Sequence, residues 1–252
     1  MNANLLEIEG LNKRFDGVKA LADFSCSIRE GEIVGLIGPN GAGKTTLFNV
    51  LTGFLGTESG DAMFRGQSLL HRRPHVIAET GVARTFQNLR LIRRMTVLEN
   101  VLLCRKHQPG ERLCDVFLRW RTIARWEAEN QAGALSILAS VGLEEKAPDL
   151  AENLSYGQQK LLSIACCLAT GAELLLLDEP VAGIAPEMRE HILSIIMGLP
   201  GRGRTVILIE HDLDAVSKVC SRVIFMDSGT KICEGTPQDV RSDPRVIEAY
   251  VD

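Results

Sequence analysis

The sequence predicts an α/β fold with an antiparallel β-layer at the N-terminus and a mostly helical insertion near the middle of the chain. Three observations predict it. A glycine-rich segment at residues 38–45 lies between an apolar run and a helical pattern. Two later apolar runs, residues 174–177 and 205–209, each lead into acidic side chains. Short buried strands that alternate with helices are typical of parallel sheets, whose ligands bind at the carboxyl ends of the strands.

The overall composition is that of a globular protein. The chain has 252 residues, of which 45% are hydrophobic and 24% are charged, and this suits one domain with an inserted subdomain. A net charge of -4 argues against a broad surface for nucleic acid or lipid headgroups. The seven cysteines include no C-x-x-C pair, so we expect free, mostly buried thiols in a reducing cytoplasm. We expect no export signal and no membrane span.

The N-terminal residues predict the antiparallel β-layer. Residues 5–11 are predicted to be extended, Asp16 and Gly17 mark a turn, and residues 24–28 alternate between apolar and polar. Phe15 stands beside this turn, where it is either a core residue or a platform for an adenine ring. The residues alone leave both interpretations open.

The glycine-rich segment predicts a cradle for the phosphates of a nucleotide. Its spacing fits G-x-x-x-x-G-K-[ST], in which the glycines let backbone N–H groups turn towards the α- and β-phosphates. Lys44 would place a positive charge near the β- and γ-phosphates, and Thr45 would ligate Mg²⁺. The predicted nucleotide contacts are Gly38, Pro39, Asn40, Gly41, Ala42, Gly43, Lys44, Thr45 and Thr46.

The residues around this loop predict a strand before it and a helix after it. Residues 33–37 are apolar enough for a buried strand. Gly53 is expected to cap the helix. The helix is predicted from apolar residues at helical spacing, which are Leu47, Val50, Leu51 and Phe54.

Residues 81–88 predict a strand that leads into a polar loop containing Gln87. The amide of Gln87 can both donate to and accept from a Mg²⁺-bound water or a phosphate oxygen. Taken alone, Gln87 would be an ordinary surface glutamine.

The segment from residue 97 to residue 153 is predicted to be mostly helical. Its apolar stripe at helical spacing consists of Leu113, Val116, Phe117, Trp120 and Ala124. Its basic residues are Arg105, Lys106, Arg112, Arg119, Arg121 and Arg125. These cations form either a solvated helix face or a docking or membrane-proximal surface.

Three further groups of polar residues follow predicted strands or begin predicted helices. Ser155 is a plausible N-cap, and a helix N-terminus beside a serine and a glycine suits an anion. Asp178 and Glu179 end an apolar strand, where Asp178 would hold Mg²⁺ and Glu179 would polarise an attacking water. His211 follows the next strand and would contact a γ-phosphate. The remaining residues predict a hairpin across 227–229 and two short capped helices.

These clusters, in this order, make the chain resemble the ATP-binding subunits of ABC transporters over essentially its whole length. The segment 154–159, Leu-Ser-Tyr-Gly-Gln-Gln, is similar to the signature motif that distinguishes ABC proteins from other P-loop NTPases. The resemblance implies a P-loop NTPase ABC ATPase core at residues 1–96 and 154–252. It implies a helical subdomain at 97–153, whose signature helix continues to about residue 170.

The resemblance also implies roles for individual residues. The cofactors would be ATP and Mg²⁺, with Phe15 stacked on adenine. Glu179, His211 and Gln87 would be catalytic, and Thr45, Gln87 and Asp178 would serve the metal. The signature residues Ser155, Gly157 and Gln158 would bind the nucleotide of a second ATPase subunit. One departure concerns coupling between the two sites, because Ala185 stands where the family usually carries an aspartate.

Within the family, the amino-acid sequences of residues 84–88, 179–183 and 243–250 most resemble those of the ATPase subunits of branched-chain amino acid importers. Close relatives of these importers transport urea and short amides. The implied partners are a second ATPase subunit in a homo- or heterodimer, two transmembrane permease subunits and, indirectly, a periplasmic or extracellular binding protein. The implied location is cytoplasmic, on the inner face of the membrane, with no nucleic acid bound. Two alternative functions remain. The first is a soluble ABC ATPase that acts on ribosomes or DNA, and the second is a regulatory module that binds a nucleotide without hydrolysing it.

Overall fold

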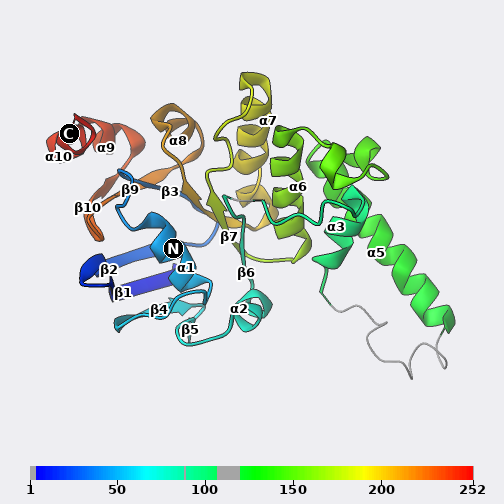
Figure 1. Cartoon of the computed structure of the whole chain (residues 1–252), viewed down its shortest axis with the longest axis horizontal. Helices are drawn as coiled ribbons and strands as arrows, with labels where there is room; N and C mark the ends of the chain where they lie inside the picture. Colours follow the sequence, from blue (N-terminus) through cyan, green and yellow to red (C-terminus); the bar gives the residue numbers. More distant parts are fainter. Residues whose placement is uncertain (1–3, 88, 107–119, 252) are drawn as a thin grey trace.

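The computed structural model describes residues 4–87, 89–106 and 120–251, which Figure 1 shows in ribbon form. Within these ranges the strands form a four-stranded antiparallel sheet and a six-stranded, mostly parallel sheet. The four-stranded sheet has the order β2-β1-β4-β5. Its strands are β1 (Asn4–Phe15), β2 (Val18–Arg29), β4 (Ser59–Phe64) and β5 (Gln67–Ser68).

The six-stranded sheet has the order β10-β9-β3-β8-β7-β6. Neighbouring strands are parallel, except that β10 runs antiparallel to β9. The strands are β3 (Ile33–Ile37), β6 (Val82–Arg84), β7 (Leu174–Asp178), β8 (Thr205–Ile209), β9 (Arg222–Asp227) and β10 (Thr230–Gly235). In the register of β7 and β8, Asp178 pairs with Ile209. The residues that follow these two strands therefore emerge side by side.

The α-helices in the described ranges are α1 (Lys44–Leu51), α2 (Pro74–Thr80), α3 (Val97–Leu103), α5 (Trp120–Ser140), α6 (Tyr156–Ala169), α7 (Pro186–Met197), α8 (Leu213–Val219), α9 (Pro237–Ser242) and α10 (Pro244–Val251). Short 3₁₀ turns lie at Glu144–Lys146, Ala151–Asn153 and Pro200–Arg202. Helices α3, α5 and α6 pack on one another, and α6 also contacts α7. Among the described helices, none combines the length and the apolar character needed to cross a bilayer.

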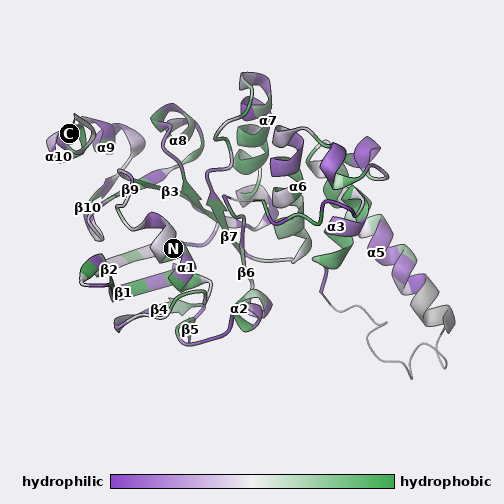
Figure 2. Ribbon diagram, in the orientation of Figure 1, coloured by the Kyte–Doolittle hydropathy of each residue, from purple (hydrophilic) through white to green (hydrophobic). Residues whose placement is uncertain are grey.

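The central strands β3, β7 and β8 of the six-stranded sheet are buried along their whole length, and Figure 2 colours the central strands of this sheet as hydrophobic. Ile33 and Ile37 of β3 belong to the core beneath the helices on one face. Val34 and Leu36 belong to a second core, which is shared with α1 and the antiparallel sheet. Side chains of a strand alternate between its faces, so continuous apolar runs mark strands that are covered twice.

The structure confirms the predicted α/β class, the N-terminal antiparallel layer and the predicted strands. One boundary is wrong: Phe54 lies beyond α1, which ends at Leu51. Gly53 adopts a left-handed φ of 73° and turns the chain away from the helix. Phe54 is therefore 44% exposed and packs edge-to-face on Phe86, with ring centroids 5.6 Å apart.

Two further predictions concern the cysteines and the side chains of the predicted helical segment. The cysteines of the described ranges are free, as predicted, but only Cys167 and Cys220 are buried and the others are partly exposed. The prediction that most are buried is therefore wrong: Cys104 and Cys166 line a cavity, and Cys26 and Cys233 lie on the strands β2 and β10. The apolar stripe at Leu113, Val116, Phe117, Trp120 and Ala124 lies outside the residues whose side chains are described, as do Arg112, Arg119 and Arg121.

Candidate functional site

The glycine-rich loop joins β3 to α1 and depends on glycine at two positions. Gly38 and Gly43 have φ values of 151° and 102°, which side chains disfavour. A Cβ at Gly38 would lie 1.9 Å from the carbonyl oxygen of Met226, and one at Gly43 would lie 2.3 Å from that of Ala20. The loop therefore packs directly against the backbone of neighbouring segments.

Lys44, the first residue of α1, folds back across this loop. Its Nζ donates to the carbonyl oxygens of Gly38 at 2.7 Å and Pro39 at 2.8 Å. Burial lowers the pKa of Lys44, while the nearby carboxylates of Glu179 and Asp178 act in the opposite direction. The ammonium group is thus held in place by the loop backbone, where it suits a phosphate anion.

A polar cavity of about 240 Å³ lies against the loop. Its walls come from separate parts of the sequence, because the residues that line it are Asn40, Gly41, Ala42, Gly43, Lys44, Thr45, Thr46, Gln87, Glu179, Ile209 and His211. Most of the predicted nucleotide contacts therefore face one cavity, together with the three residues predicted to be catalytic.

The carboxylate of Glu179 is the meeting point of those three residues. Gln87 Nε2 donates to Glu179 Oε2 at 3.1 Å, and His211 Nε2 lies 3.0 Å from Glu179 Oε1. The Glu179 side chain is 18% exposed, so water can still reach it. Glu179 also has a left-handed φ of 49°, a conformation that costs free energy for a residue with a Cβ.

Asp178 does not join the contacts around Glu179, because its carboxylate is paired with Arg84. Arg84 Nη2 donates to Asp178 Oδ2 at 2.7 Å, and the two side chains are only 5% and 4% exposed. Arg84 Nη1 also donates to Asn49 Oδ1 at 2.6 Å. Asp178 does not line the polar cavity, so its role in metal binding stays a prediction. Sequence reasoning missed Arg84 as its partner.

The polar cavity offers ligands that suit Mg²⁺. A hydroxyl from Thr45 and an amide oxygen from Gln87 line it, and magnesium prefers oxygen ligands. No group of three or more His, Cys, Asp or Glu side chains in the described ranges could hold a metal by itself. This fits Mg²⁺, which usually keeps several waters and is bound partly by substrate phosphates.

The signature residues Ser155, Gly157 and Gln158 do not reach the polar cavity. Ser155 Oγ accepts from Gln158 N at 3.3 Å, and Gln158 Oε1 accepts from Ser155 N at 3.0 Å, which makes a capping box on α6. A Cβ at Gly157 would lie 2.5 Å from Met188 Cγ, so glycine allows α6 to approach α7. The structure thus leaves the start of α6 separate from the loop of the same chain.

Phe15 is not a core residue, since it is 42% exposed at the end of β1. Lys13 Nζ lies 5.3 Å from the centre of its ring. Phe15 does not line the polar cavity. The core interpretation is therefore wrong, and a role in adenine binding stays a prediction.

Two buried residues beneath Glu179 escaped sequence reasoning. Lys160 of α6 donates from Nζ to the backbone carbonyl of Glu179. Glu210 Oε1 accepts from Val181 N at 2.8 Å, and burial raises the pKa of Glu210 to about 7. One signal could have found Lys160: it shares the buried face of α6 with Leu161 and Ile164, where lysine is rare unless it has a partner.

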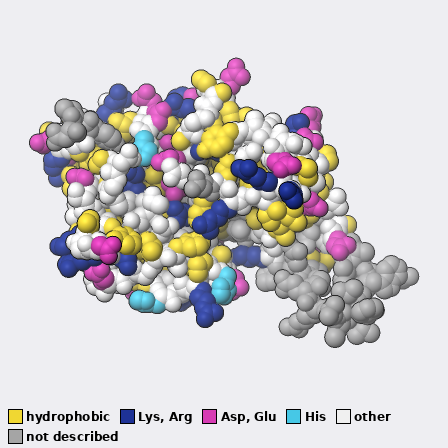
Figure 3. Space-filling view, in the orientation of Figure 1, with side chains coloured by type: hydrophobic (Ala, Val, Ile, Leu, Met, Phe, Trp, Pro, Cys, Tyr) yellow, Lys and Arg dark blue, Asp and Glu magenta, His cyan; other side chains and the backbone are white. Residues whose placement is uncertain are grey.

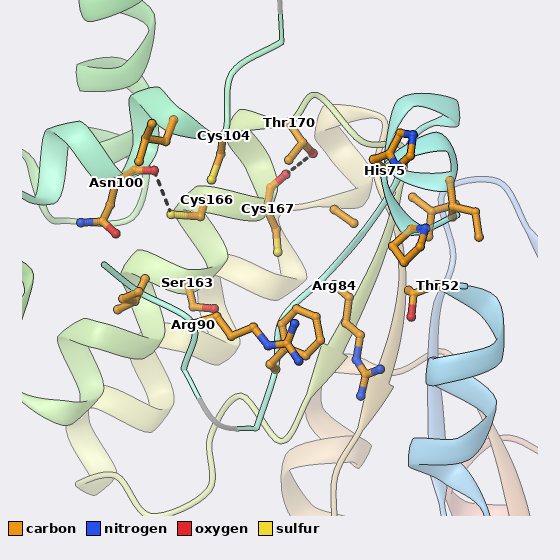
Figure 4. A pocket seen from close by; sticks show the side chains of 18 of the residues that line it. Thr52, His75, Arg84, Arg90, Asn100, Cys104, Ser163, Cys166, Cys167 and Thr170 are labelled. Atoms are coloured by element: carbon orange, nitrogen blue, oxygen red, sulfur yellow. Dashed lines mark hydrogen bonds between the residues drawn. The ribbon is translucent and has the colours of Figure 1, made fainter. Parts of the chain in front are cut away.

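A second cavity, of about 430 Å³, lies beside the first and is mainly apolar (Figure 4). It is lined by parts of α2, β6, α3 and α6 and by the segment between β6 and α3. Arg84 and Arg90 line one side of it, and Cys104, Cys166 and Cys167 line another. On the face shown in Figure 3, hydrophobic and basic side chains lie next to one another between α2 and α3.

Comparison with known families finds a match to the ABC transporter family over residues 21–182. A second match, to the family described as branched-chain amino acid ATP-binding cassette transporter, covers residues 230–251. The second match falls on the C-terminal segment that contains α9 and α10.

Curated relatives match the full chain. The high-affinity branched-chain amino acid transport ATP-binding protein LivG of Salmonella typhimurium is 41% identical over 252 residues, which cover 100% of this chain and 99% of LivG. The corresponding protein BraF of Pseudomonas aeruginosa is 37% identical over the same coverage. A solved nucleotide-free ATP-binding cassette from an ABC transporter superimposes with a TM-score of 0.86 at 35% identity, covering 99% of this chain and 100% of that one.

Proposed function

The chain belongs to the ABC transporter family of ATP-binding proteins, and from this premise we propose that it powers an importer of branched-chain or other hydrophobic amino acids. Membership carries the ATPase activity coupled to transport. The cargo is proposed from the printed names of relatives such as LivG and BraF. The match at residues 230–251 supports the same cargo.

In this proposal the residues of the polar cavity bind and hydrolyse ATP. The loop residues 38–46, which include Lys44, hold the phosphates. Glu179 accepts a proton from the attacking water. Gln87 and His211, which both lie within hydrogen-bond distance of the Glu179 carboxylate, orient that carboxylate towards the water. Thr45, Gln87 and Asp178 would hold Mg²⁺, which would neutralise phosphate charge.

We infer that the active unit is a dimer. The loop and the Ser155 end of α6 face different places on one chain, so each ATP needs the loop of one subunit and the signature residues of the other. A helix N-terminus with free N–H groups suits a γ-phosphate. A single subunit should then hydrolyse ATP poorly.

The apolar cavity is bordered by Leu103 and Cys104 of the predicted helical subdomain and by residues of the predicted core such as Phe86 and Cys166. Two permease subunits would dock against this side, which would hold the chain at the inner face of the membrane. A binding protein outside the cell would act on the permeases and not on this chain. Phe86 lies in the wall of the apolar cavity, and Gln87 follows it in the wall of the polar cavity. Gln87 would therefore report nucleotide occupancy to the permeases.

The observation that carries the proposal is the contact of Gln87 and His211 with the carboxylate of Glu179, in the cavity that the glycine-rich loop also lines. The test is a phosphate-release assay on the purified chain, followed by leucine uptake in vesicles that contain the chain with its permeases. ATP-dependent phosphate release with no uptake of any hydrophobic amino acid would overturn the cargo. A chain that binds ATP without turnover in the assembled complex would overturn the enzymatic role.

A further inference from the structure

We infer that Lys160 is a positioning residue that ties the signature helix α6 to the backbone of Glu179 in the same subunit. The inference rests on the proposed function, because it assigns Lys160 to the hydrolytic step. Lys160 lies five residues after Ser155 and is 5% exposed. Its Nζ donates to the carbonyl oxygen of Glu179.

The backbone at Glu179 needs such a support. Its left-handed φ of 49° is unfavourable for a residue with a side chain. Such a conformation persists only where the surroundings determine it. Glu179 N donates to the carbonyl of Ile209 at 2.9 Å, and its own carbonyl accepts from Ala182 N at 3.3 Å. Lys160 adds a charge-assisted hydrogen bond to the same carbonyl, and such bonds are stronger than neutral ones.

Glu210 completes the support from the other side. It is 3% exposed, it accepts a hydrogen bond from the backbone N–H group of Val181, and it directly precedes His211 in the chain. The segment after Glu179 and the segment that carries His211 are thus held by one buried carboxylate. Lys160 and Glu210 together fix the peptide groups on both sides of the contact between Glu179 and His211.

The consequence is a physical connection between two half-sites. In the proposed dimer, the Ser155 end of α6 closes on the nucleotide of the partner subunit, whereas Glu179 serves the nucleotide of its own subunit. A displacement of α6 is transmitted through Lys160 to the Glu179 carbonyl and so to the carboxylate. Occupancy of one site therefore adjusts the general base of the other.

The alternative explanation for Lys160 is structural only. Its Nζ lies 5.3 Å from the centre of the Tyr156 ring, and a buried lysine stem can fill space in a core. A purely structural role predicts a loss of stability with unchanged kinetics per folded molecule. A positioning role predicts a loss of turnover with unchanged ATP affinity.

The test is Lys160→Met, which keeps the length of the stem and removes the charge. We expect turnover to fall roughly 10- to 100-fold, as for a misplaced reacting group, and the Hill coefficient for ATP to fall towards one. The dissociation constant for ATP should not change, and Lys160→Arg should restore part of the turnover. Lys146→Met, which removes an exposed lysine paired with Asp149, is the matched control.

Several outcomes would overturn the inference. Normal turnover and cooperativity in Lys160→Met would do so, as would an equal loss in Lys146→Met. If Lys160→Met fails to fold because Glu210 loses a neighbouring charge, the double variant Lys160→Met with Glu210→Gln removes both groups and is measured in its place. Failure of the proposed function is a separate result, since the unaltered chain would then release no phosphate.

Discussion

The two neighbouring cavities of this protein differ in how strongly chemistry dictates their residues. The proposed ATP hydrolysis requires inward N–H groups, a cation and a general base at fixed positions, and the polar cavity offers Lys44 and Glu179 for the last two roles. The apolar cavity needs only a shape and a hydrophobic lining, which many side chains could provide. Function can therefore be assigned to residues of the first cavity and only to the surface of the second.

A single segment forms part of both walls. Arg84 and Phe86 line the apolar cavity, and Gln87 lines the polar one. Arg84 also forms a buried ion pair with Asp178. The two cavities thus have consecutive residues, Phe86 and Gln87, in their walls. The comparison can be tested by substitutions that change one cavity and leave the other intact.

The largest effect should come from Glu179→Gln in the polar cavity. The amide retains the size of the side chain and can still accept a hydrogen bond from Gln87, but it cannot take a proton from water. We expect turnover to fall by about 10²- to 10⁴-fold, with Mg-ATP binding and ATP-dependent dimers retained. Stopped-flow phosphate release measures the first and size-exclusion chromatography with ATP the second. Unchanged ATP hydrolysis in Glu179→Gln would contradict the assignment of Glu179 as the general base.

The next effect concerns the wall between the cavities. Arg84→Met leaves the Asp178 carboxylate buried without its counter-charge, which should cost about 3–5 kcal/mol of unfolding free energy. Urea denaturation measures this. Arg65→Met is the matched control, because Arg65 is 48% exposed in its pairs with Glu30 and Glu173, and exposed pairs contribute at most about 1 kcal/mol. Similar losses in the two variants would contradict the structural role of Arg84.

The outcome at these positions shows what the sequence could predict. The phosphate loop, its strand and its helix were predictable because a fixed spacing of glycine, lysine and threonine follows from one chemical task. Gln87, Glu179 and His211 were predictable because each follows a buried strand, and parallel strands end at one edge of the sheet. Their convergence on one carboxylate required the register of β7 against β8.

The remaining features depend on side-chain packing between distant segments. Nothing local to Arg84 indicates that it pairs with Asp178, 94 residues later. Phe15 and Phe54 are both aromatic residues beside turns, and only the fold shows that both are exposed. The apolar cavity combines four secondary-structure elements, so no local pattern in the sequence predicts it.

A pH-dependent effect is expected from Glu210. Burial raises its pKa from the ordinary 4.5 to about 7, so the folded chain keeps this proton at pH values where the unfolded chain has lost it. The resulting stabilisation is fully present below about pH 4.5 and is lost as the pH rises through 7, by about 3 kcal/mol at most. The measurement is the difference in unfolding free energy between the unaltered chain and Glu210→Gln at pH 5 and pH 8. A difference that is independent of pH would contradict the raised pKa.

Lys44→Ala tests whether the polar cavity binds the phosphates of ATP. Removing a charge-assisted contact to phosphate costs about 1.5–3 kcal/mol, so the dissociation constant for ATP should rise roughly 10- to 100-fold. Glu179→Gln, which should bind ATP normally, is the control for the overall shape of the cavity. Equilibrium binding of a fluorescent ATP analogue measures both. Normal affinity in Lys44→Ala would argue against the phosphate cradle.

The smallest expected effect should separate the two cavities most clearly. Leu103 ends α3, is 51% exposed and lines the apolar cavity. An aspartate there would place a charge in the proposed permease interface, and burying an uncompensated charge is unfavourable. We expect Leu103→Asp to weaken association with the solubilised permeases by about 10-fold, or about 1.4 kcal/mol. Phosphate release by the isolated chain should not change, because Leu103 does not line the polar cavity.

Met197→Asp provides the matched control for this substitution. Met197 is 50% exposed at the end of α7, so it has the same apolar character and exposure as Leu103, but it lies outside the apolar cavity. If both aspartates weaken association equally, the effect comes from added negative charge and not from the cavity. If Leu103→Asp alone weakens it, the apolar cavity is the docking surface. Its function then lies in its surface as a whole, whereas the polar cavity depends on a few named atoms.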